Sequence, residues 1–117
     1  MIIQAKEYVS TGFGPEDAKT ISNLIDNSLL KEESVTIDFT DIDFFCTYFF
    51  KKAFTFRLDL MSQEEYNSKI KVIGLSKVGE AAYSLAYDNS VDYYSIPPEM
   101  RQARDEEIAE LVEELIY

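Results

Sequence analysis

The stretch of residues 35–47 constrains the fold of this chain more than any other part of the sequence. Residues 35–39 read Val-Thr-Ile-Asp-Phe, a run of mostly β-branched side chains that ends near a carboxylate and is typical of a strand. An acidic turn with Asp41 and Asp43 follows, and an apolar helix is predicted to begin at Thr47. A strand, a turn and a helix in direct succession predict an α/β domain.

The hydroxyl of Thr47 allows two interpretations. As a helix cap it would accept a hydrogen bond from a free backbone amide and stabilise the domain by about 1 kcal/mol. Free amides and the positive end of the helix dipole also favour a phosphate at such a position. Phosphorylation would add about −1.5 to −2 charges beside Asp41 and Asp43. The residues alone leave both interpretations open.

The remaining chain alternates between strand and helix patterns. Strands are predicted at residues 2–9, 35–39 and 70–75, with a short edge strand at residues 91–96 that Pro97 and Pro98 end. Helices are predicted at residues 15–30, 47–62, 77–87 and 99–116, whereas residues 63–69 are expected to form a polar loop. Pro15 suits the first position of its helix, and Ser76 is expected to cap another. The alternation predicts roughly four strands in a mostly parallel sheet, covered by about four helices.

In a parallel sheet the loops that leave the carboxyl ends of the strands gather at one edge, where binding sites form. These loops are predicted to be Gly12-Phe13-Gly14, residues 41–47 and Ser76-Lys77. The predicted topology therefore points to the same region as the segment that begins at Val35.

The amino-acid composition excludes several classes of function. The chain has 117 residues, which fits a single domain spanning residues 1–117. It has no histidine, which excludes imidazole bases and Ser-His or Cys-His nucleophile pairs. One cysteine fits a reducing cytoplasm, and neither a signal peptide nor a membrane-spanning run is expected. A net charge of −11 disfavours binding to nucleic acid or to anionic membranes.

Several motifs have simpler structural interpretations. Asp38, Asp41 and Asp43 are carboxylates that could hold Mg²⁺, but Asp residues in a turn after a strand account for them. Gly12-Phe13-Gly14 lacks the residues of a phosphate-binding loop and is interpreted as a turn before a helix. Cys46 is interpreted as a buried, inert thiol. No cofactor or metal is expected.

The chain resembles the STAS fold, named for sulfate transporters and anti-sigma-factor antagonists, and especially small bacterial STAS-like proteins. The similarity lies in Gly12-Phe13-Gly14 before an amphipathic helix, in Asp38-Phe39-Thr40-Asp41-Ile42, and in the apolar helix around Phe49. In the antagonists an Asp-Ser pair heads that helix, and a partner kinase phosphorylates the Ser. Aligned on Phe44, the pair falls on Cys46 and Thr47, and the following Ser-Gly is replaced by Tyr48-Phe49.

The resemblance implies a non-enzymatic regulatory module of the bacterial cytoplasm that docks a kinase-like ATPase or an anti-sigma-factor-type protein. Thr47 is the candidate phosphoacceptor. The candidate partner-binding residues all lie in the loops at the carboxyl ends of the strands: Gly12, Phe13, Gly14, Asp41, Asp43, Phe44, Phe45, Cys46, Thr47 and Ser76.

An alternative function is suggested by the acidic last helix. Six carboxylates would occupy its outer face, and Ile108, Leu111 and Leu115 would pack against the domain. Carboxylates spaced like backbone phosphates would make the protein a nucleic-acid-mimicking inhibitor, of phage origin. A small phosphatase or ligand-binding enzyme is disfavoured, because no catalytic motif is complete.

Overall fold

The computed structural model describes residues 1–11, 14–32, 34–43 and 45–101. Gly12, Phe13, Phe44 and the predicted acidic helix beyond residue 101 therefore lie outside the described residues. In chain order the elements are β1 (Ile2–Gln4), the 3₁₀ helix η1 (Ala5–Glu7), α1 (Pro15–Lys31), β2 (Val35–Asp38), α2 (Thr47–Ala53), the 3₁₀ helix η2 (Thr55–Asp59), α3 (Gln63–Lys69), β3 (Ile70–Ile73) and α4 (Lys77–Tyr94).

The three strands form one parallel sheet in the order β1-β2-β3, with β2 in the centre as its apolar sequence predicts. The chain passes from β1 to the neighbouring strand β2 and then, in the same direction across the sheet, to β3. Because such crossovers are right-handed, both connections place their helices on the same face of the sheet. The side chains of Ile3, Val35, Ile37 and Ile70 are buried on that face.

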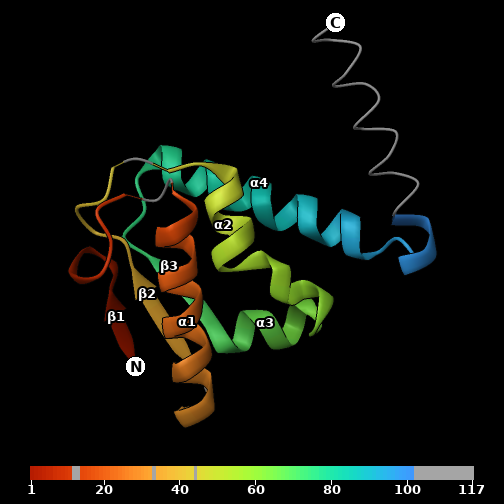
Figure 1. The fold of residues 1–117 in the computed structure, drawn as a ribbon, viewed down its shortest axis with the longest axis horizontal. Coiled ribbons are helices and arrows are strands. Elements are labelled where there is room, and N and C mark those ends of the chain that lie inside the picture. The colour runs from red at the N-terminus through yellow and green to blue at the C-terminus, as the bar shows by residue number, and fades with distance from the viewer. Residues whose placement is uncertain (12–13, 33, 44, 102–117) are drawn as a thin grey trace, which may run out of the picture.

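The core lies between this face and the helices (Figure 1). It contains a cluster of aromatic rings, in which the Phe39 ring contacts four other phenylalanine rings at centroid distances of 5.5 to 6.1 Å. Helix α2 packs between α1 and α4, and α4 continues past α2 beyond the sheet (Figure 1). Within the described residues no helix is long and apolar enough to cross a membrane.

The opposite face of the sheet is open in the described part of the chain. Ile2 is 63% exposed and Ile73 is 45% exposed, and Thr36 and Asp38 between them are half-buried. The prediction of a parallel sheet with covering helices is confirmed, but the sheet has three strands and not four. The predicted burial holds for Ile37, whereas Val72 is only half-buried.

The expected fourth strand is wrong because residues 91–94 belong to α4, which continues through the predicted turn at residues 88–90. Ser90 is a polar residue that nevertheless faces the interior, where its hydroxyl lies 2.8 Å from the hydroxyl of Thr55. A satisfied hydroxyl can be buried at little cost, so nothing breaks the helix there. Pro97 and Pro98 follow the helix instead of a strand.

The expected polar loop at residues 63–69 is wrong as well, because these residues form α3. Ser62 caps this helix by accepting a hydrogen bond from the amide of Glu65 at 3.1 Å. Tyr66 is its one fully buried side chain, so the segment has no apolar periodicity to reveal a helix.

Other elements are shorter than predicted, including β3, which ends at Ile73 instead of residue 75. Strand β1 ends at Gln4, which pairs with Asp38 at the end of β2, so no partner backbone remains for the expected residues 5–9. Helix α2 ends at Ala53 instead of residue 62, because the buried Arg57 donates to the carbonyl groups of Ala53 and Phe54. These contacts take up orphan carbonyls at the end of the helix.

Candidate interaction surface at the carboxyl edge of the sheet

The three strands end in a single row. Gln4, Asp38 and Ile73 are the last residues of β1, β2 and β3, and they are paired across the sheet. The segments that leave the strands therefore start side by side, as the topology predicts. We call the surface formed by Lys6, Asp38, Thr40, Asp41, Gly74 and Ser76 the carboxyl edge.

Asp38 organises the turn that follows β2. Its Oδ1 atom accepts hydrogen bonds from the hydroxyl of Thr40 at 2.6 Å and from the Thr40 amide at 2.9 Å. Both bonds stabilise the ionised carboxylate, with the hydroxyl making the larger contribution, and they hold the pKa of Asp38 below its ordinary value. Asp38 is thus committed to ordering the turn.

Gly74 is the first residue after β3. It allows the segment that leaves β3, which we call the exit of β3, to lie against this turn. A Cβ atom at position 74 would lie 2.2 Å from Oδ1 of Asp38 and 2.6 Å from the Thr40 hydroxyl oxygen. The φ angle of Gly74 is +74°, a backbone conformation that residues other than glycine rarely adopt. The exits of β2 and β3 therefore meet only because residue 74 has no side chain. Gly74 was not predicted as a site residue, although a glycine directly after an apolar strand was the available signal.

Asp41 joins the turn to the exit of β1. It has a φ angle of +70°, which aspartate tolerates better than most residues, and the turn closes where the Ile42 amide donates to the Phe39 carbonyl at 3.1 Å. The Asp41 carboxylate lies 3.0 Å from Nζ of Lys6 in an exposed ion pair. Such pairs contribute little stability, but this one ties two exits together. Lys6 is a second residue that the sequence analysis missed, because only the fold brings it to Asp41.

The segment between the turn and α2 is placed differently from the prediction. Cys46, and not Thr47, occupies the N-cap position of α2, and Thr47 is the first helical residue. The Cys46 side chain makes no capping hydrogen bond, and Thr47 is not at the cap position, so the helix-cap interpretation of Thr47 is wrong. The Thr47 side chain is half-buried and keeps a path to solvent.

Phe45 lies in the core and not on the surface. It is 9% exposed, and its ring stacks on Phe50 at a centroid distance of 5.4 Å. A Cβ atom at Gly79 would lie 3.0 Å from the same ring, so α4 starts in close contact with it. Phe45 therefore holds the segment before Thr47 against the core, and a partner would meet its neighbours Asp43 and Cys46.

Ser76 behaves as predicted, since its hydroxyl accepts a hydrogen bond from the Gly79 amide at 3.1 Å and caps α4. Gly14 is the N-cap residue of α1, and Pro15 follows as the first helical residue. Of the predicted contact residues that the structure describes, the exposed ones are Asp41, Asp43 and Ser76, and the half-buried ones are Gly14, Cys46 and Thr47.

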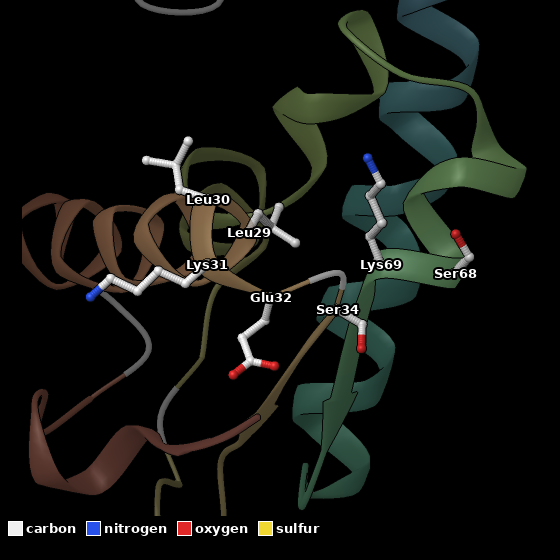
Figure 2. Close-up of a pocket in the computed structure, with 7 residues that line it drawn as sticks. All are labelled: Leu29, Leu30, Lys31, Glu32, Ser34, Ser68 and Lys69. Atoms are coloured by element: carbon white, nitrogen blue, oxygen red, sulfur yellow. The ribbon is translucent and has the colours of Figure 1, made fainter.

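A wide pocket lies at the opposite, amino edge of the sheet (Figure 2). It has a volume of about 670 Å³ and lies between the end of α1 and the end of α3. Its charged side chains, Lys31, Glu32 and Lys69, point away from one another in Figure 2. Catalysis requires side chains that converge on a reacting atom, so this pocket is a poor candidate for an active site.

No group of three His, Cys, Asp or Glu side chains that could hold a metal ion occurs in the part of the chain that the structure describes. Two tyrosine hydroxyls form a partly buried pair, in which the Tyr66 and Tyr83 oxygens lie 2.7 Å apart. Burial raises the pKa of Tyr66 and raises that of Tyr83 to about 12, so both hydroxyls stay protonated at neutral pH. They connect α3 to α4 and lie away from the carboxyl edge.

Comparison with known proteins identifies a family for this chain. A family model described as a STAS-like domain of unknown function matches residues 17–80, more than half of the 117-residue chain. The matched region begins in α1, includes β2 and β3, and ends in the first turn of α4. No curated protein and no solved structure matches the chain.

Proposed function

The chain belongs to the family of STAS-like domains of unknown function, and we propose that it is a non-enzymatic regulatory module that docks a kinase-like ATPase through its carboxyl edge. The family membership supports the comparison with anti-sigma-factor antagonists, in which the Ser that a partner kinase phosphorylates heads the corresponding helix.

One observation carries the proposal. The exits of all three strands are joined into one surface, by the Lys6–Asp41 ion pair on one side and by the close approach of Gly74 to Asp38 on the other. Thr40 and Asp41 are exposed at its centre. A surface that is ordered before it meets a partner loses less conformational entropy on binding.

The chemistry of the edge favours docking over catalysis. The full chain has no histidine, and the carboxylates of Asp38 and Asp41 are engaged by Thr40 and Lys6. Each of these carboxylates keeps free lone pairs, but a general base also needs a pocket that holds the substrate proton within reach, and neither Asp38 nor Asp41 lines the pocket at the amino edge. Groups that already hold the loops together are better suited to a binding surface.

Thr47 is the proposed switch. A kinase-like partner would transfer the γ-phosphoryl group of ATP to the Thr47 hydroxyl, with release of ADP and of the hydroxyl proton. The side chain is half-buried at the first position of α2, close in sequence to the exposed Asp43. A phosphate would add about −1.5 to −2 charges there and weaken the docking of a surface that fits the unmodified side chain.

Photo-crosslinking in the native host tests the proposal. A photoreactive amino acid replaces Thr40 at the carboxyl edge or, as a matched control, Leu30, which is 85% exposed at the amino edge. We expect the Thr40 position to capture a protein with an ATP-binding kinase-like domain, identified by mass spectrometry, and the Leu30 position not to capture it. Capture of that protein only from position 30 would place the interface at the other edge. Capture of a nucleic-acid enzyme would support the inhibitor alternative.

A further inference from the structure

A groove between α1 and α2 is separate from the carboxyl edge. It has a volume of about 410 Å³. Helix α1 supplies Pro15, Lys19, Ser22 and Asn23, and the α2–η2 segment supplies Tyr48, Lys52 and Phe56. Except for the adjacent pair Ser22 and Asn23, these residues are three or four positions apart within each element, so each element presents one face to the groove.

The groove combines aromatic side chains with positive charge. Tyr48 is 54% exposed, and the Lys52 ammonium lies 5.4 Å from the centre of its ring. Neither Lys19 nor Lys52 has an ion-pair partner among the residues that the structure describes. The neighbouring carboxylate of Asp26 is already paired with Arg57 at 2.7 Å. Two uncompensated lysines beside exposed aromatic surface are suited to an acidic, amphipathic segment.

The chain contains a segment of this kind. Residues 102–117 carry six carboxylates and one arginine. Ile108, Leu111, Val112 and Leu115 recur at helical spacing. An apolar stripe of this kind is stabilised when it packs against apolar surface.

The last described residue places the start of this segment near the groove. The Arg101 guanidinium lies 3.1 Å from the carboxylate of Asp59, the last residue of η2. It also donates to the carbonyl groups of Tyr94 and Ile96 at 3.2 and 3.0 Å. Phe56, at one end of the groove, belongs to the same short η2 helix as Asp59.

Residues 102–117 are long enough to cover the groove. The part of the groove between Phe56 and Tyr48 extends about 12–15 Å along the α2–η2 segment. Sixteen residues span about 24 Å as a helix. We infer that residues 102–117 dock into the groove of the same chain, with the apolar stripe on Tyr48 and Phe56 and with carboxylates beside Lys19 and Lys52. This inference does not rest on the proposed partner.

Carbodiimide cross-linking of the full chain tests the inference, because the reagent joins a lysine amine to a carboxylate in direct contact. We expect cross-links from Lys19 or Lys52 to glutamates of residues 106–114, located by mass spectrometry. Lys71 and Lys77 are also exposed and serve as internal controls that should not react with the segment. Replacing Leu111→Ser keeps every charge, and it should lower the yield about tenfold through the lost apolar contact. Ala109→Ser should leave the yield unchanged.

Several outcomes would overturn the inference. Equal cross-linking of Lys71 and Lys77, or an unchanged yield for Leu111→Ser, would indicate random encounters of the segment with the surface. Absence of any cross-link to Lys19 and Lys52 would exclude the groove. Cross-links that join isotopically light and heavy chains in a mixed sample would identify a second copy as the occupant. Melting curves of each variant confirm that the domain remains folded.

Discussion

Single residues at the carboxyl edge act mainly on the backbone. Asp38 and Thr40 order one turn, Asp41 adopts a positive φ angle, and Gly74 permits two exits to touch. The composition of the turn was readable from the sequence, whereas the roles of Gly74 and Lys6 were not. Both residues act on groups about thirty-five positions away along the chain, and a pattern within one segment carries no information on such contacts.

Replacing Gly74→Ala should destabilise the domain by about 2 kcal/mol or more, because a Cβ atom meets Asp38 and the positive φ angle is unfavourable. Urea unfolding measures the effect. Gly14→Ala is the matched control, since no atom lies within 4 Å of a Cβ atom there. It should cost no more than about 1 kcal/mol, the loss expected at an N-cap position. Equal losses of unfolding free energy for Gly74→Ala and Gly14→Ala would contradict the close contact between Gly74 and Asp38.

Thr47→Ala should change the free energy of unfolding by less than about 0.5 kcal/mol, because the Thr47 hydroxyl caps nothing. Ser76→Ala, which removes an observed cap, should cost about 1 kcal/mol in the same denaturation assay. A larger loss at Thr47 than at Ser76 would restore the helix-cap interpretation of Thr47.

The carboxyl group of Asp38 should titrate below its ordinary pKa, and Thr40→Val should raise that pKa by removing the stronger of two hydrogen bonds. Because the folded-state pKa is lowered, the stabilisation is present above the unfolded value of about 3.9 and is lost as the pH falls through the folded-state pKa. NMR titration of the carboxyl carbon measures both values. An identical pKa in the variant would show that the hydroxyl has no influence.

Elements were predictable where apolar periodicity was strong. Helix α1 and the central strand β2 lie where their patterns place them. Helix α3 was not predicted, because Tyr66 is its one buried side chain and leaves no apolar periodicity. The start of α4 was predicted correctly, whereas its length was not. In α4 the residues Asp88, Asn89 and Ser90 resemble a turn, yet tertiary contacts of Ser90 and the neighbouring tyrosines override that preference.

Arg57 determines where α2 ends and binds it to α1. Its buried guanidinium donates to Ala53, to the carbonyl and hydroxyl of Ser22, and to Asp26. Arg57→Leu should therefore destabilise the domain by about 3 kcal/mol, because several buried carbonyls lose their donor. Lys69→Leu removes an exposed ion pair with Glu65 and should change stability by less than about 1 kcal/mol. Similar values for both variants in chemical denaturation would contradict this role of Arg57.

At the scale of the whole molecule, the topology was more predictable than the number of elements. Any chain of parallel strands joined by right-handed crossovers gathers the exits of its strands at one edge. The predicted position of the strand ends at one edge therefore holds, although the predicted fourth strand does not form. The open face of the sheet was not predictable, because Ile2 and Ile73 read as ordinary strand residues although they remain exposed.

The affinity of the partner captured at Thr40 tests the central claim most directly. Calorimetry compares the wild-type chain with Thr47→Ala, Thr47→Glu and the amino-edge control Leu30→Glu. We predict that Thr47→Glu weakens binding about tenfold or more, equivalent to about 1.4 kcal/mol, while Thr47→Ala and Leu30→Glu bind within about twofold of wild type. Equal affinities for Thr47→Glu and the wild-type chain would contradict the proposed switch at Thr47, and a larger loss for Leu30→Glu than for Thr47→Glu would contradict docking through the carboxyl edge.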